Sequence, residues 1–218
     1  EVFNEPNLPF EWGTSPVDPA AYTRLLAAAY RGAKRADASV QVVSAALSPR
    51  TGGYGGTMED VDFLDGVYRA VGQAHFNMLG LHAYLGNFAP EADSSCVPMC
   101  FRTIELLRAV MEKHGDSAKK ALITGIGVLE QTAQDLGAYE WMELPADERA
   151  DYLVKALQLA NANYRWIAGA MVFNLDYATT PWVPQSSPMH WFSLLNPDRS
   201  PRQAYNRLKD ARTNGALP

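Results

Sequence analysis

The sequence predicts an α/β fold in which parallel strands alternate with helices. Short runs of β-branched and apolar residues alternate with longer segments whose apolar residues follow helical spacing. Successive strands that are joined through helices run parallel, because each helix returns the chain to the start of the sheet. The expected strand ends also recur about every 40 residues, which indicates one repeated strand–helix unit. These ends are Glu5, Ala45, His82, Gly125 and Asn174.

Five helices are expected between and after these strands. The first follows Asp18, which suits the N-cap, and Pro19, whose missing N–H costs nothing in the first turn. The third is expected to end at Gly115, and the last to begin at Ser200-Pro201. The apolar stripes of the helices lie within residues 22–33, 63–71, 104–111, 150–160 and 204–208.

The strands after the first are expected at Val40–Leu47, Phe76–Tyr84, Ala121–Val128 and Ile167–Tyr177. A parallel sheet of this kind belongs to a doubly wound fold or to part of a barrel. The dinucleotide-binding fingerprint is missing, and the glycine-rich stretch at 51–57 lacks the Lys-Ser/Thr pair of a phosphate-binding loop. We interpret that stretch as a loop that follows a strand.

Composition narrows the class of protein. The 218 residues suffice for one domain, 1–218, and the formal net charge is −5. The sequence has no stripe of Lys and Arg residues, which argues against a nucleic-acid or anionic-membrane surface. No apolar run is long enough to span a membrane. No set of residues has the spacing of a metal site, and we expect no cofactor.

The two cysteines, Cys96 and Cys100, lie in the short stretch SSCVPMC. One interpretation is a disulfide that closes a surface loop, which indicates an oxidising compartment and a secreted or extracytoplasmic protein. The other is a pair of free thiols. A metal site would need further ligands.

Polar residues gather where the expected strands end. In a parallel barrel the carboxyl ends of the strands form the face that carries the active site. One polar strand end is unremarkable, but five in register predict a functional site. The residues concerned are Asn4-Glu5, Ser44, His82 and Tyr84, Thr124, and Asn174 and Asp176.

The stretch VFNEPNLPFEWG (residues 2–13) is the most specific motif. It resembles the fourth strand of the clan A glycoside hydrolases, which are (β/α)₈ TIM barrels, and its longer Asn-Glu-Pro-Asn-x-Pro-x-x-Trp form is most similar to family 39 and its bacterial relatives. The resemblance implies that Glu5 is the general acid/base and that Asn4 contacts the sugar 2-hydroxyl. Phe3 stands where the family usually has tryptophan.

The same resemblance implies further contacts to a carbohydrate substrate. His82 and Tyr84 form an H-x-Y strand ending that lines the sugar subsite in similar proteins. Tryptophan rings stack on sugar C–H faces, although packing in the core is an equally good interpretation of the two later tryptophans. The remaining candidates for substrate binding are Trp12, Asn174, Asp176, Trp182 and Trp191.

The seventh strand of similar enzymes carries the nucleophilic glutamate in a sequence such as Ile-Thr-Glu-Phe-Gly. This chain has Gly125 at that position, between an intact Ile-Thr and Gly127. A retaining glycosidase needs two carboxyl groups about 5–5.5 Å apart, so hydrolysis by this route is expected to be lost. Three explanations compete: an engineered replacement, a natural non-catalytic protein, or substitution by Glu130.

The resemblance begins within the fourth strand, so the chain contains five of the eight units of a barrel. Five strands of a closed barrel leave two unpaired edges and an exposed apolar interior. We therefore expect the three N-terminal units to be supplied by a longer chain or by a partner subunit.

Overall fold

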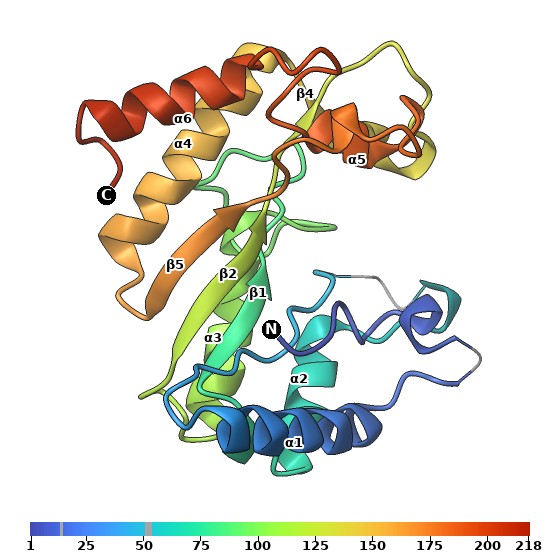
Figure 1. The fold of residues 1–218 in the computed structure, drawn as a ribbon, viewed down its shortest axis with the longest axis vertical. Coiled ribbons are helices and arrows are strands. Elements are labelled where there is room, and N and C mark those ends of the chain that lie inside the picture. The colour runs from blue at the N-terminus through green and yellow to red at the C-terminus, as the bar shows by residue number, and fades with distance from the viewer. Residues whose placement is uncertain (14, 51–53) are drawn as a thin grey trace.

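The computed structural model describes residues 1–13, 15–50 and 54–218. Its centre is a three-stranded parallel sheet in the order β1-β2-β5. The strands are β1 (Met78–His82), β2 (Lys120–Ile126) and β5 (Ile167–Val172). Figure 1 shows them side by side, with helices around them. The predicted α/β fold with parallel strands is confirmed.

Two earlier segments extend this sheet by single parallel bridges, from Val43 to Met78 and from Val2 to Ser44. The five segments therefore lie in the order in which they occur along the chain. The first two are shorter than expected. Phe3 and Glu5 have positive φ angles of 73° and 40°, which turn the first segment away from an extended conformation.

Helices connect the strands as expected. Asp18 caps the first helix by accepting a hydrogen bond from the N–H of Ala20 (2.8 Å), and Gly115 follows the third with a φ of 72°. The last long helix begins slightly later than predicted, because Pro201 forms a bridge with Leu195. The helices are α1 (Pro19–Ala36), α2 (Asp60–Arg69), α3 (Ile104–Lys113), α4 (Ala146–Asn163), α5 (Pro188–Phe192) and α6 (Gln203–Thr213).

Some short elements have no counterpart in the predicted pattern. After β2 the chain forms β3 (Leu129–Glu130) and β4 (Glu143–Leu144), a small parallel pair. The 3₁₀ helices are η1 (Pro9–Trp12), η2 (Tyr54–Gly56), η3 (Gly72–His75), η4 (Phe101–Thr103), η5 (Gly137–Met142) and η6 (Tyr177–Thr179). The glycine-rich stretch at 51–57 lies partly outside the described residues.

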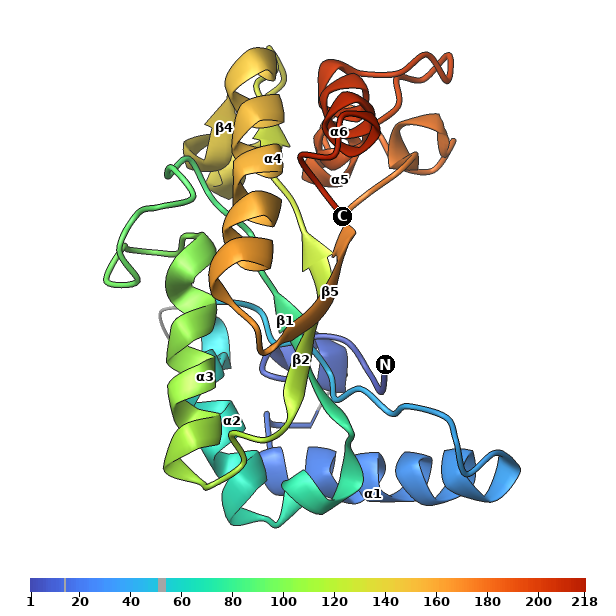
Figure 2. The ribbon, with the colours of Figure 1, turned by 90° about the vertical axis from the view of Figure 1, so that its left-hand side faces the viewer.

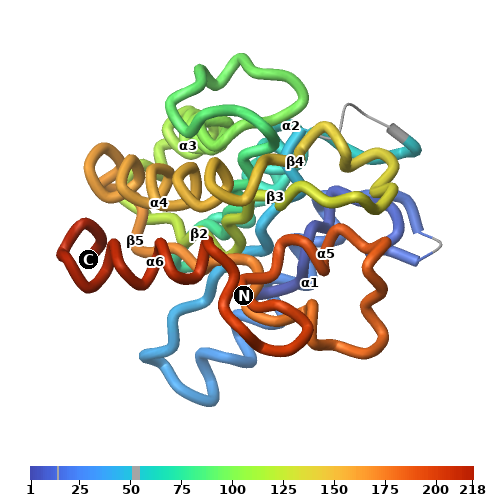
Figure 3. The backbone as a smooth tube through the Cα atoms, turned by 90° about the horizontal axis from the view of Figure 1, so that it is seen from above, coloured from blue at the N-terminus to red at the C-terminus, as the bar shows by residue number. Residues whose placement is uncertain are grey.

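The core lies between the sheet and its helices. Helix α1 packs against α2, and α2 packs against α3. Figure 2 shows α3 and α4 on the same side of the sheet, and Figure 3 shows α4 and α6 side by side. The largest fully buried apolar side chains include Phe63, Leu81, Phe101, Ile104, Met111 and Ile123.

The outer edge of β5 is not covered by another strand of the described chain. β5 pairs with β2 on its inner side, and Met171 is 54% exposed. A groove of about 740 Å³ lies along this edge, between β5 and the helices α4 and α6. Within the described residues, this edge therefore has unpaired backbone groups beside an open groove.

A buried ion triad joins the small β3–β4 unit to the C-terminal part of the chain. Glu130 contacts Arg149 at 2.7 Å and Arg202 at 2.6 Å, and both arginine side chains are almost fully buried. Arg149 also donates to the carbonyl oxygens of Val128 and Phe192. Burial lowers the pKa of Arg149 to about 10, although Glu130 acts in the opposite direction.

Replacing Glu130 with alanine is expected to lower the free energy of unfolding by about 3–5 kcal/mol, because two buried guanidinium groups lose their counter-charge. Urea denaturation measures this loss. The control is Asp151→Ala, which removes the exposed pair with Arg207 and should cost less than about 1 kcal/mol. Equal losses in the two variants would mean that the triad does not hold these elements together.

Candidate functional site

The site is centred on a contact between Glu5 and His82. An oxygen of the Glu5 carboxylate lies 2.6 Å from Nδ1 of His82. His82 ends β1, and the N–H of Glu5 donates to the carbonyl of Ala46 (3.0 Å), which positions the first segment at the same edge of the sheet. The two side chains are only 17% and 10% exposed, so the contact is largely shielded from water. An N–H that donates to the carboxylate holds Glu5 in one orientation.

Gly125 faces this pair from the neighbouring strand. It is the register partner of His82 in the pairing of β1 with β2. A Cβ atom at Gly125 would lie 2.9 Å from Cδ2 and 3.2 Å from Nε2 of His82, and 3.6 Å from the hydroxyl of Tyr84. Four residues singled out in the sequence therefore meet at one place: Glu5, His82, Tyr84 and Gly125.

Tyr84 connects this centre to an aromatic cluster. Its ring lies 5.6 Å from that of His82 and 6.0 Å from that of Phe173, measured between centroids, in edge-to-face geometry. Burial raises the pKa of the Tyr84 hydroxyl, and the nearby Glu5, Tyr139 and Tyr177 raise it further. The hydroxyl therefore stays protonated and is able to donate.

Tyr139 and Tyr177 are site residues that the sequence did not single out. Tyr177 lies three residues after the expected strand end at Asn174, and this short separation could have indicated that it belongs to the site. Tyr139 lies in η5, far from any strand end in the sequence, and only the folding of the β3–β4 unit brings it near Tyr84.

The first segment contributes two more carboxylates. Glu1 accepts hydrogen bonds from the N–H of Ala46 (2.9 Å) and the hydroxyl of Thr124 (3.0 Å), next to Gly125 in the chain. The side-chain amide of Asn4 donates to Glu11 at 3.4 Å, so a contact from Asn4 to a sugar stays a prediction.

Trp12 packs within the motif at residues 2–13. Its indole N–H donates to the carbonyl of Pro6, and its ring stacks on Phe3 with centroids 5.6 Å apart. A role for Trp12 in sugar binding stays a prediction.

Asn174 uses its side chain within the protein. It is buried, its amide donates to the carbonyl of Met189 (2.8 Å), and its oxygen accepts from the N–H of Tyr177 and the hydroxyl of Ser193. The peptide bond that precedes it is cis. Asn174 therefore anchors the loop that presents Tyr177.

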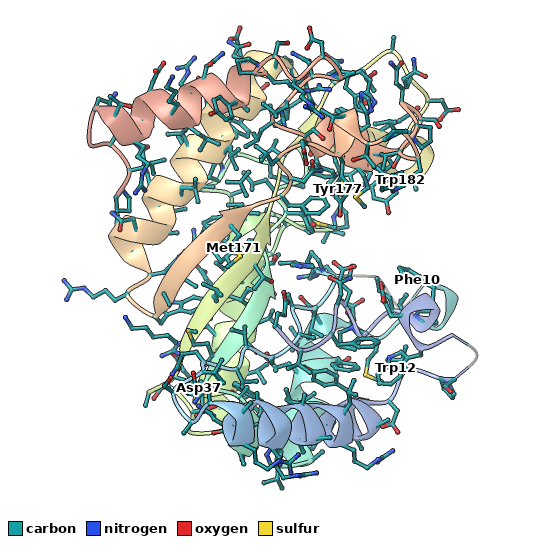
Figure 4. The ribbon with its side chains drawn as sticks, in the orientation of Figure 1. Phe10, Trp12, Asp37, Met171, Tyr177 and Trp182 are labelled. Atoms are coloured by element: carbon teal, nitrogen blue, oxygen red, sulfur yellow. A yellow bond between two sulfur atoms is a disulfide. The ribbon has the colours of Figure 1, made fainter. Side chains whose placement is uncertain are left out.

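The remaining candidates of this loop differ in exposure. Trp182 is 82% exposed, and Figure 4 shows it on the same upper side of the molecule as Tyr177. Asp176 is also exposed, at the start of η6. Trp191 is partly buried, donates to the carbonyl of Gln185 and stacks against Arg202, which fits a role in packing. Of the two later tryptophans, Trp182 has the ring that is free to meet a ligand.

The structure excludes Glu130 as a replacement nucleophile. Both of its oxygens are engaged by Arg149 and Arg202 in the buried triad. The hypothesis that Glu130 takes the place of the missing carboxylate is therefore wrong.

Three further observations bear on the class of protein. Cys96 and Cys100 form a disulfide with an S–S distance of 2.07 Å, in the loop between β1 and α3. Within the described ranges, no group of three or more His, Cys, Asp or Glu side chains has the arrangement of a metal site. No helix in the described part of the chain is long and apolar enough to cross a membrane.

Comparison with known proteins supports the fold. No protein-family model and no curated sequence matches this chain. Among solved structures, a glucosidase from Croceicoccus marinus is similar with a TM-score of 0.63 and 19% identity, over 90% of this chain and 36% of that one. A family GH128 (subgroup II) endo-β-1,3-glucanase from Pseudomonas viridiflava has a TM-score of 0.57 and 17% identity, over 99% and 68%.

A GH2 β-galacturonidase from Eisenbergiella tayi is also similar, with a TM-score of 0.54 and 13% identity, over 88% of this chain and 30% of that one. The chain thus spans about a third of the glucosidase and of the galacturonidase. At these identities the similarity concerns the fold: this chain has the α/β fold of a glycoside hydrolase domain.

Proposed function

We propose that this chain is a β-glycan-directed domain of the retaining glycoside hydrolase type, with Glu5 as the acid/base and Gly125 at the position of the nucleophile. The observation that carries the proposal is the Glu5 carboxylate, which contacts His82, the register partner of Gly125. The glycosidase-like fold supports it. The resemblance to clan A and family 39, and the (β/α)₈ barrel to which the five strand segments would belong, are part of the same proposal.

The arrangement explains which chemical step is kept and which is lost. A carboxyl group at position 5 can donate a proton to the oxygen of a glycosidic bond, and His82 keeps that group oriented. Double displacement also requires a carboxylate that attacks the anomeric carbon, and glycine has none. The chain with Gly125 is therefore expected to bind glycans and to leave ordinary glycosides intact.

A non-catalytic carbohydrate-binding protein is the alternative. The close fit of the His82 ring to a glycine backbone favours it, because the ring takes up space that a side chain at position 125 would need. The partly shielded acid opposes it, since a binding protein has no evident need for a shielded carboxyl group at position 5. Trp182, the exposed tryptophan beyond β5, serves either function as a stacking surface.

We also propose that the outer edge of β5 binds a further strand, supplied by three strand–helix units in a longer chain or by a partner subunit. The free strand edge, the exposed Met171 and the adjoining groove support this. The disulfide between Cys96 and Cys100 supports a secreted or extracytoplasmic location, because such bonds persist in oxidising compartments.

Restoring a carboxylate with Gly125→Glu is expected to raise the hydrolysis of aryl β-glycosides by at least about 10³-fold, because both catalytic carboxyl groups are then present. The His82 ring has to move slightly to admit the new side chain. Release of nitrophenol from a panel of nitrophenyl β-glycosides measures the rate.

Gly125→Gln is the matched control, since it has the same size without a nucleophile and should stay at the starting level. Adding Glu5→Gln to Gly125→Glu should lower the rate by about 10²- to 10⁴-fold. If Gly125→Glu cleaves no glycoside while both proteins bind glycans, the alternative function holds.

A stability measurement tests the position of the His82 ring against Gly125 and requires no enzymatic activity. Gly125→Ala is expected to lower the free energy of unfolding by about 1–3 kcal/mol, because its Cβ overlaps the ring. Gly169→Ala on β5 is the control, since its Cβ would meet Leu122 at an ordinary 3.5 Å, and it should raise stability by about 0.5 kcal/mol. Urea denaturation that gives both variants the same stability would contradict this geometry.

The proposed open edge predicts the behaviour of the isolated chain. The 24.0 kDa polypeptide is expected to associate or aggregate at micromolar concentration, because the edge of β5 and its groove stay uncovered. Gel filtration with light scattering measures the mass. A stable, well-packed monomer would show that no missing unit is needed.

A further inference from the structure

The charged side chains near the Glu5–His82 pair are mainly carboxylates. The Glu1 carboxylate accepts a hydrogen bond from Thr124, the residue before Gly125, and the Glu11 carboxylate accepts one from Asn4, the residue before Glu5. His82 is the basic group of the centre, and its Nδ1 is already committed to Glu5.

In the part of the chain that the structure describes, these carboxylates have no ion pair with lysine or arginine. Within the described residues, no hydrogen bond or ion pair joins an arginine or lysine to Glu1, Glu5 or Glu11. The two buried arginines of the neighbouring unit, Arg149 and Arg202, are committed to Glu130 and to carbonyl oxygens. The described wall of the site is therefore acidic.

Three tyrosines provide the uncharged polar groups of the site. Tyr139 and Tyr177 lie close enough to Tyr84 to influence its ionisation, and Tyr177 packs edge-to-face on Phe173. In the described part of the chain, none of the three phenol hydroxyls forms a hydrogen bond with the protein. A phenol hydroxyl donates and accepts without adding charge, which suits the hydroxyl groups of a neutral sugar.

We infer that this site takes a neutral sugar unit and discriminates against uronic acids. The inference rests on the proposed function and specifies its substrate class. A uronate would bring a further negative charge toward Glu1, Glu5 and Glu11 in a partly shielded site, whereas recognition of a sugar carboxylate ordinarily uses arginine or lysine. A neutral sugar offers hydroxyls to Tyr84, Tyr139 and Tyr177 and a C–H face to the aromatic rings.

Matched oligosaccharides test the inference directly. Titration of the 218-residue chain at nanomolar concentration, followed by its tryptophan fluorescence, would use cellohexaose and laminarihexaose, each against the same hexamer oxidised at C6 to glucuronate. The neutral hexamer of at least one pair is expected to bind at least about tenfold more tightly at low salt. The difference should narrow as added salt screens the repulsion.

The possible outcomes separate this inference from the proposed function. Equal or tighter binding of the oxidised hexamer in both pairs would overturn the preference for neutral sugars and leave a glycan-binding site in place. Failure of all four hexamers to bind would overturn both.

A charge reversal at Glu11 tests whether the discrimination against uronic acids arises at this site. Glu11→Arg is expected to raise affinity for the oxidised hexamer by about tenfold while it changes affinity for the neutral one by less than about threefold. Asp210→Arg is the matched control, because it makes the same change in net charge at an exposed position on α6. If both variants raise binding of the oxidised hexamer equally, net charge and not the site is responsible, and the inference fails.

Discussion

The short contact between Glu5 and His82 sets the geometry of the whole site. It joins two segments that lie far apart in the sequence, and it can form only because parallel strands bring their carboxyl ends to one edge. Once Nδ1 of His82 is bonded to Glu5, the rest of the ring lies over position 125. A glycine there leaves the ring undisturbed, whereas any side chain has to displace it. Gly125 and the orientation of His82 are therefore structurally dependent on each other.

Polar residues near the strand ends divide into two groups with different physical roles. Asn174 is buried and Glu130 is largely shielded, and the hydrogen bonds of both are satisfied within the protein. They hold the β3–β4 unit and the loop after β5, the two segments that carry Tyr139 and Tyr177. The tyrosine hydroxyls have no such partners in the described chain. Groups that are satisfied within the protein thus support these segments, whereas the tyrosines keep free hydrogen-bonding capacity.

Much of the fold follows from local physical chemistry. The Asp18 cap, the glycine after α3 and the apolar stripes of the helices act over a few residues, so the sequence specifies them directly. The meeting of Glu5, His82 and Gly125 was also predictable, because strand ends of a parallel sheet share an edge. The positive φ angles of Phe3 and Glu5, which shorten the first strand to a bridge, are imposed by the surrounding structure.

The residues that prediction missed depend on long-range packing. Glu130 looked like a possible nucleophile because its arginine partners lie 19 and 72 residues away, and no local pattern reveals such a triad. Tyr139 reaches the site only because η5 lies between β3 and β4, a pair too short to give a strand signal. The sequence also left open whether Trp191 packs in the protein or binds a ligand. Its packing depends on the contact with Arg202, which residues adjacent to Trp191 in the sequence do not reveal.

Under the proposed function, recognition and bond cleavage involve different atoms. Tyr139 and Tyr177 lie on η5 and on the loop after β5, whereas the position proposed for the nucleophile belongs to β2. A glycine at position 125 would then remove one reacting group and leave Glu5, His82 and the tyrosines in place. The His82 ring would still have to shift before a side chain at position 125 could act. That separation would reconcile a glycosidase-like fold and a shielded carboxyl group with a second strand that supplies no group able to attack.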